Sequence, residues 1–227
     1  MVVDMHTDMK NQLLEAILPH VAFDGWSEAA FGQACEDSDI ELSHARLAFP
    51  RGALDLAVFF HVKGDKAMQL RIDEEDFSTM RFRDKVAAAV RFRLQSVEDK
   101  EAVRRGAALF SLPQNVALGA RLIWGTADAI WSGLDDNSTD LNWYTKRTTL
   151  SAVYGSCVLF WLGDDSPDHA ATWEFLDRRI ENVMQFEKVK SKARENAPLQ
   201  QILSGPKWLI SKISSPQNKT GKHSPGT

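Results

Sequence analysis

Apolar residues that recur at intervals of three and four, with almost no strand pattern beside them, constrain this chain more than any other feature. The sequence holds no alternating runs of Val, Ile and Thr, and no Asn-Gly or Asp-Gly pair joins two such runs as in a hairpin. Side chains three and four positions apart share one face of a helix, and that face is buried. We therefore predict an all-α fold.

Three long helices are predicted in the second half of the chain. Pro113 suits a first helical turn because its missing N–H would have no partner there. The polar run 135–140 breaks the pattern and offers residues 138–140 as an N-cap, and Gly163 ends the helix that follows. The predicted ranges are Pro113 to Leu134, about 140 to Leu162, and Ser166 to about Phe186.

Three short helices and a longer one are predicted at the front. The first covers residues 13–18 and ends near Pro19, the second covers 27–34, the third covers 41–47, and the longer one starts at Gly52. This plan is that of a helix-turn-helix unit joined to a helical body, and it resembles the TetR regulators. We divide the chain into a helix-turn-helix-like head (1–51), a helical body (52–192) for which this resemblance implies ligand binding and dimerisation, a linker with an amphipathic helix (193–215) and a disordered tail (216–227).

The charge of the predicted head argues against DNA as its partner. Residues 1–60 hold three basic and ten acidic residues, a net charge of −7. A duplex-binding protein neutralises phosphates with Lys and Arg, commonly about six to ten of them. In the presumed recognition helix Glu41 offsets Arg46. DNA binding is therefore disfavoured, and a lipid-responsive TetR-type transcriptional regulator is kept as the alternative function.

Neither export nor a membrane span is expected from the sequence. The first twelve residues lack the apolar segment of a signal peptide and the arginines of a transit peptide. The longest apolar stretches, 116–124 and 154–162, reach about half of the ~20 residues that a spanning helix needs. Cys35 and Cys157 lie far apart without C-x-x-C spacing, which favours a reducing compartment and buried thiols.

The C-terminal segment reverses the charge of the head and carries an amphipathic pattern. Residues 188–227 hold eight basic residues and one acidic residue. Between 199 and 213, Leu and Ile follow helical spacing with Lys mainly elsewhere, which is typical of a helix in a bilayer interface. The alternative is a last helix that packs onto the core, which Gly205-Pro206 would weaken. The predicted membrane-binding residues are Leu199, Ile202, Leu203, Lys207, Trp208, Leu209, Ile210 and Ile213.

Two adjacent aromatic residues, Trp143 and Tyr144, follow a polar helix start. Neighbouring side chains on a helix point about 100° apart, so both do not face the same core. Exposed Trp and Tyr beside Arg are typical of protein-binding surfaces, while core packing of both is the alternative. The candidate partner-binding residues are Asp140, Trp143, Tyr144 and Arg147.

The chain lacks the residue patterns of common enzymes. Its six histidines show neither H-x3-H nor H-E-x-x-H spacing, and no P-loop or G-x-S-x-G motif is present. Glu41 and His44 form one E-x-x-H, whereas a di-iron bundle needs two of these and two further Glu. Asp164 and Asp165 are interpreted as loop or cap acids. We expect no catalytic residue, no metal site and no cofactor.

Several motifs together resemble the ninth coenzyme-Q biosynthesis protein family. The most specific is STDLNWYTKR at 138–147. The others are FDGW at 23–26, the run at 49–61, SLPQN at 111–115, the pair Trp124 and Trp131, and DSPD at 165–168. The resemblance covers roughly residues 12–215. It implies a TetR-like fold that has given up DNA for lipid, a homodimer, and an apolar pocket that holds isoprenoid lipid or phospholipid.

The same resemblance implies an accessory protein of ubiquinone biosynthesis rather than an enzyme. Such a protein binds isoprenoid quinone intermediates at a membrane and presents them to a partner, the di-iron demethoxyubiquinone hydroxylase. It implies that Trp143 and Tyr144 belong to the patch for that partner and that residues 199–213 form the membrane helix. Without a transit peptide, the implied location is the cytoplasmic face of the inner membrane.

Small residues among the aromatics of the helices at 113–134 and 140–162 favour a cavity there. They are Gly119, Gly125, Ala127, Ala129, Ala152, Gly155 and Ser156. Small and large side chains mixed along facing helices leave room for a ligand, and close packing across glycine is the alternative. The candidate lipid-binding residues are Leu122, Ile123, Thr126, Ile130, Trp131, Val153 and Cys157.

Overall fold

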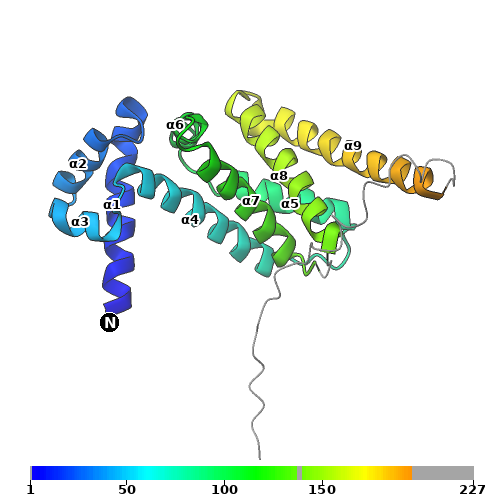
Figure 1. Cartoon of the computed structure of the whole chain (residues 1–227), viewed down its shortest axis with the longest axis horizontal. Coiled ribbons are helices and arrows are strands. Elements are labelled where there is room, and N and C mark those ends of the chain that lie inside the picture. Colours follow the sequence, from blue (N-terminus) through cyan, green and yellow to red (C-terminus); the bar gives the residue numbers. More distant parts are fainter. Residues whose placement is uncertain (1, 137–139, 196–227) are drawn as a thin grey trace, which may run out of the picture.

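The computed structural model describes residues 2–136 and 140–195, and within them the chain is helical without a strand, as predicted. The helices are α1 (Val2–Asp24), α2 (Glu28–Asp37), α3 (Leu42–Ala48), α4 (Ala53–Glu74), α5 (Phe82–Gln95), α6 (Lys100–Ser111), α7 (Val116–Gly133), α8 (Asp140–Leu162) and α9 (Ala170–Glu195), with a 3₁₀ turn, η1 (Pro167–His169), before α9. Figure 1 shows α1 to α3 at one end and α5, α8 and α9 toward the other, with α4, α6 and α7 between them.

The head packs around Phe31, which is fully buried between apolar residues of α1, α2 and α4. The hydroxyl of Ser27 caps α2 by accepting a hydrogen bond from the amide of Ala30 at 3.2 Å. Trp26 ties the head to the body because its indole N–H donates to the carbonyl of Ala102 in α6 at 3.0 Å. The core of the head therefore extends into α6 and does not end at the start of α4.

The first helix continues past the point where an end was predicted. Pro19 lies inside α1, where it removes one backbone hydrogen bond at a cost of about 3 kcal/mol. The helix runs on to Asp24 because Val21, one turn beyond Ile17, is fully buried in the head core. Burial of this apolar residue offsets part of the proline penalty.

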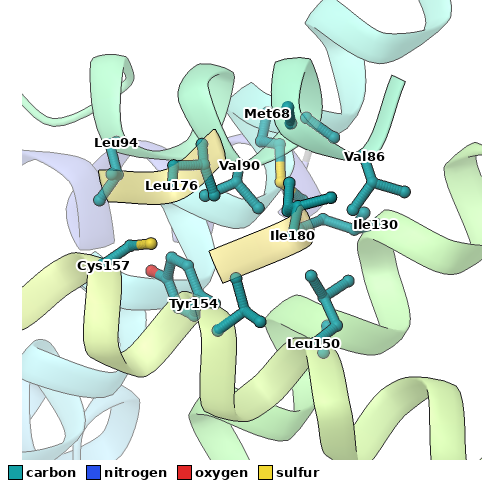
Figure 2. Close-up of a cluster of buried hydrophobic side chains, with 14 of the residues drawn as sticks. Met68, Val86, Val90, Leu94, Ile130, Leu150, Tyr154, Cys157, Leu176 and Ile180 are labelled. Carbon is teal, nitrogen blue, oxygen red and sulfur yellow. The ribbon is translucent and has the colours of Figure 1, made fainter. Parts of the chain in front are cut away.

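Five helices form the core of the body, namely α4, α5, α7, α8 and α9. Met68, Ile130 and Leu176 are fully buried there and come from α4, α7 and α9. Figure 2 shows Tyr154 and Cys157 of α8 in the same cluster. The ranges of α7 and α8 agree with the predicted helices to within about three residues. The helices α5 and α6 lie in a segment for which no helix was predicted.

The carboxylate of Asp164 sets the start of α9, as its interpretation as a cap acid predicted. It accepts hydrogen bonds from the amides of Ser166 and Thr172, both at 2.9 Å, and from the hydroxyl of Thr172 at 2.5 Å. These hydrogen bonds, the hydroxyl of Thr172 first, hold the pKa of Asp164 well below its usual range. At its other end α9 continues to Glu195, beyond the predicted end near Phe186, because Lys, Arg and Glu are good helix formers.

Candidate functional site

A cavity of about 410 Å³ lies at the junction of head and body. Its wall is formed by α4, α5, α6, α7 and α8, and Trp26 of the head closes one side. Most of the lining is apolar, and it includes Phe60, Val103, Phe110, Leu122, Ile123 and Trp161. A predominantly apolar cavity with a few polar groups is the usual form of a small-molecule site.

Glycines have different roles around this cavity. A Cβ added to Gly119 would lie 2.8 Å from Cβ of Phe110, so Gly119 permits close packing of α7 on α6. A Cβ on Gly155 would meet only Cγ2 of Ile123, at 4.0 Å, and Gly155 lines the cavity. Gly125 borders open space on the exposed side of α7. Gly119 therefore allows two helices to pack closely, whereas Gly155 leaves space inside the cavity.

The cavity opens to the surface beside exposed apolar side chains. Val116 at the start of α7 is 54% exposed and Leu159 of α8 is 68% exposed, and both line the cavity. Two residues close to them in sequence are exposed as well, namely Leu112, which precedes α7, and Phe160 of α8. We call Val116 and Leu159 the mouth of the cavity. An apolar mouth admits a hydrocarbon chain without desolvating polar groups.

Four polar residues, His61, Arg93, Ser111 and Tyr154, also line the cavity, and all except Ser111 join a buried hydrogen-bonded cluster, Tyr154 through the side chain of Thr126. Arg93 donates from Nε to Oδ1 of Asp65 at 2.6 Å and from Nη2 to the carbonyl of His61 at 3.0 Å. Thr126 donates to the same Oδ1 at 2.9 Å, and Nε2 of His61 lies 2.9 Å from the Thr126 hydroxyl. We call His61, Asp65, Arg93, Thr126 and Tyr154 the polar cluster.

Burial keeps the two aromatic members of the polar cluster uncharged. Desolvation lowers the pKa of His61 from 6.5 to about 4, and the opposing pull of the Asp65 carboxylate does not cancel it. Burial also raises the pKa of the Tyr154 phenol above 10.0. The two other ionisable members of the cluster, Arg93 and Asp65, form an ion pair.

The seven candidate lipid-binding residues do not form one site. Leu122 and Ile123 line the cavity, and Thr126 lies in the polar cluster at its wall. Trp131 and Val153 instead line a second cavity of about 360 Å³, bordered by α5, α7, α8 and α9. The remaining two, Ile130 and Cys157, are fully buried in the core. Burial raises the pKa of the Cys157 thiol to about 11.

The residues that the sequence analysis did not single out are His61, Arg93 and Tyr154. His61 stands among apolar residues in a predicted helix, and Arg93 follows a run of alanine and valine in α5. A polar residue at a core-facing helix position is a signal for a buried cluster. Its partners lie on other helices, so spacing along the chain does not reveal them.

Trp143 and Tyr144 contact each other and Trp124 of α7. The ring centroids of Trp143 and Tyr144 are 4.7 Å apart, and that of Trp124 lies 6.0 Å from Trp143 and 6.4 Å from Tyr144. Trp143 and Tyr144 are both half-buried, so part of this cluster faces the surface and part packs inside. We call these three residues the aromatic patch.

Arg147 packs against Trp143 of the aromatic patch. Its side chain is 3% exposed and its Nε lies 2.5 Å from Oδ1 of Asp128, with Asp136 on its other side at 3.3 Å. The guanidinium carbon stands 4.0 Å from the ring centroid of Trp143, a cation–π contact. Arg147 is therefore engaged within the chain. The backbone of Asp140 begins α8, and its side chain lies outside the described residues.

The basic residues of the head have partners within the chain. Arg46 pairs with Glu28, stands 5.0 Å over the ring of Phe31, and donates to the carbonyl of Pro50 at 3.4 Å. Arg51 donates to both carboxylate oxygens of Asp55, at 2.7 Å from its amide and 2.6 Å from Nη2. A phosphate would therefore have to compete with these carboxylates for the two guanidinium groups.

The predicted membrane-binding residues lie outside the described part of the chain. They are Leu199, Ile202, Leu203, Lys207, Trp208, Leu209, Ile210 and Ile213. Within the described part, no helix is both long enough and apolar enough to cross a bilayer. No group of three or more His, Cys, Asp or Glu among the described residues is placed to hold a metal ion.

Comparison with known proteins identifies relatives of this chain. The family model described as COQ9 matches residues 116–187. "Ubiquinone biosynthesis protein COQ9-A, mitochondrial" of Xenopus laevis is 30% identical over 87% of this chain and 65% of its own length. The COQ9 protein of Homo sapiens is 27% identical over 78% of this chain and 58% of its own length. The chain thus spans less than two thirds of these relatives.

A solved structure gives independent support for the fold. The TetR transcriptional regulator from Nitrosomonas europaea superposes with a TM-score of 0.62, over 76% of this chain and 96% of that regulator, at 16% sequence identity. This likeness concerns the fold alone. It confirms the TetR-like arrangement that the sequence predicted.

Proposed function

We propose that this chain belongs to the COQ9 family that it resembles, and that it is a lipid-binding accessory protein of ubiquinone biosynthesis and not an enzyme. In this proposal the cavity holds the isoprenoid tail of a quinone intermediate or another lipid. The membrane-binding helix brings the protein to the bilayer, and the aromatic patch docks the hydroxylase that receives the intermediate.

The observation that carries the proposal is the apolar cavity with its apolar mouth. Its volume of about 410 Å³ lies within the range of about 300–1,000 Å³ that ligand sites occupy. The mouth at Val116 and Leu159 lets a tail longer than the cavity extend outward. Burial of hydrocarbon against such a wall stabilises a complex by about 25 cal/mol per Å² of apolar area.

The aromatic patch supports the part of the proposal that concerns a protein partner. Half-buried Trp and Tyr, held by a buried Arg, form a rigid surface whose exposed edges lose little entropy on binding. Part of the resemblance rests on these residues. The homodimer and the location at the cytoplasmic face of the inner membrane are also proposals, which light scattering and cell fractionation test.

The alternative function, a lipid-responsive transcriptional regulator, has less support. It shares the cavity, but it also needs a head that contacts phosphates. The guanidinium groups of Arg46 and Arg51 are paired with Glu28 and Asp55, and the head carries a net negative charge. Retention on heparin and on DNA at moderate salt would favour the regulator.

Filling the cavity tests the lipid-binding proposal. Gly155→Leu places a branched side chain into the cavity, and Gly125→Leu makes the same change in open space. We expect lipid extraction and native mass spectrometry to recover isoprenoid quinone or phospholipid from the wild type and from Gly125→Leu, and much less from Gly155→Leu. Equal lipid in both variants, or none in the wild type, would contradict the proposal.

A further inference from the structure

The strongest further feature of the cavity is the polar cluster on its otherwise apolar wall. We propose that this cluster is the binding site for the head group of the ligand and that it selects an uncharged head with hydroxyl or carbonyl groups over a phosphate head. The inference rests on the proposed function, because it requires that the cavity bind a lipid.

The cluster is built from four helices and is rigid. His61 and Asp65 come from α4, Arg93 from α5, Thr126 from α7 and Tyr154 from α8. Arg93 is 4% exposed, and Thr126 and Tyr154 are 0% and 2% exposed. Hydrogen bonds between side chains of different helices fix their orientation before any ligand arrives.

The hydrogen-bond directions determine which atoms remain for a ligand. The Asp65 carboxylate accepts from Arg93 and from the Thr126 hydroxyl, so the Thr126 oxygen is left to accept from His61. Oδ2 of Asp65, 3.6 Å from Nε2 of His61, also favours a proton on that nitrogen. The backbone of Leu122 is a further hydrogen-bond partner of His61. With its proton on Nε2, the neutral imidazole has Nδ1 as its acceptor.

The charge of the cluster argues against a phosphate in the same place. Among the described residues that line the cavity, Arg93 is the one cation, and Asp65 already neutralises it at 2.6 Å. A buried phosphate would be left without a counter-charge and would stand near the Asp65 carboxylate, which is costly in a low-dielectric site. A hydroxyl or carbonyl group of a ligand could instead form hydrogen bonds with uncharged side chains, namely the His61 imidazole and the Tyr154 phenol.

The position of the cluster also fixes the direction of the ligand. The polar cluster lies away from the mouth along both helices that they share: ten residues separate Val116 from Thr126 on α7, and five separate Tyr154 from Leu159 on α8, which correspond to about 15 Å and about 7 Å of helix. An uncharged head at the polar cluster leaves its tail along the apolar wall toward the mouth. A two-tailed phospholipid would enter the other way, with its charged head left at the mouth in water.

Three short probes with the same two-isoprene tail test the proposal by isothermal titration calorimetry on the full chain. One carries a quinone head, one a monophosphate and one no polar head. We expect the quinone to bind at least about tenfold more tightly than the monophosphate, because each unmatched buried polar group costs about tenfold or more in affinity.

Isosteric variants assign the effect to the cluster. Tyr154→Phe and His61→Phe remove single polar groups, and each should weaken the quinone about tenfold while the hydrocarbon probe is unchanged. The control Trp161→Phe, on the apolar wall, should weaken all three probes alike. Circular dichroism checks that each variant folds, and Tyr154→Phe keeps the test valid where His61→Phe is unstable.

Two results would overturn the head-group site. In one, the monophosphate binds the wild type as tightly as the quinone. In the other, both Phe variants lose the quinone and the hydrocarbon in parallel. Lipid binding itself would then stand, with the head at the mouth. If no probe binds the wild type at all, the proposed function falls together with this inference.

Discussion

Acidification between pH 6.5 and pH 4 should destabilise this protein through one residue, His61. Burial lowers the pKa of folded His61 to about 4, against 6.5 for the exposed side chain. Above pH 6.5 both states are neutral and the full stability is present. As the pH falls below 6.5 the unfolded state gains a proton that the folded state does not, so the free energy of unfolding declines until about pH 4.

The size of the effect follows from the same two values. A difference of one pKa unit corresponds to about 1.4 kcal/mol, so His61 alone should cost about 3 kcal/mol across this window. The two charged groups that face His61 shift its pKa in opposite directions, because Asp65 raises it and Arg93 lowers it. The pKa of Asp164 is held well below the usual range, so its contribution is lost only at lower pH.

Urea unfolding followed by tryptophan fluorescence at pH 7.5, 6.5, 5.5 and 4.5 measures this decline. His61→Gln should flatten most of it, since glutamine does not titrate, while the exposed His44→Gln should follow the wild type. A wild-type free energy of unfolding that stays constant down to pH 4.5 would refute the argument. So would a decline of the same slope in His61→Gln.

Three further predictions concern the ion pair, the tail and the aromatic patch. Arg93→Met should cost about 3–5 kcal/mol because it leaves Asp65 buried without a partner, and adding Asp65→Leu should restore most of that in urea unfolding. Leu203→Asp should reduce flotation with anionic liposomes, and Gln201→Asp, the same charge change off the apolar stripe, should reduce it less. Trp143→Ala should weaken hydroxylase binding in surface plasmon resonance at least about tenfold, and Trp143→Phe should retain more of it.

The parts of the fold that local patterns determine were predicted from the sequence. The period of apolar residues gave the all-α class and placed α7 and α8, because a helix that buries one face displays that face in its sequence. The end at Pro19 was wrong because the burial of Val21 outweighs a local rule. Tertiary packing, which the local pattern does not contain, decides such cases.

The cavity shows the same limit at the level of the site. Gly155 and Gly119 look equivalent in the sequence, yet one borders empty space and the other a side chain 2.8 Å away. Leu122 and Ile123 lie on the cavity wall, but Ile130, two turns further along the same helix, faces the core. The polar cluster joins residues up to 93 positions apart, from His61 to Tyr154, a separation at which no spacing rule applies.

The indole of Trp26 joins the head to the wall of the cavity. This contact gives the head a structural role that does not involve nucleic acid. Its ring lines the cavity, packs against Phe60 with centroids 5.6 Å apart, and donates to the carbonyl of Ala102. Cutting the chain after residue 51 would therefore leave the body with an open side and a severed hydrogen bond. The head would therefore be needed even without any contact to DNA, because it closes one side of the cavity.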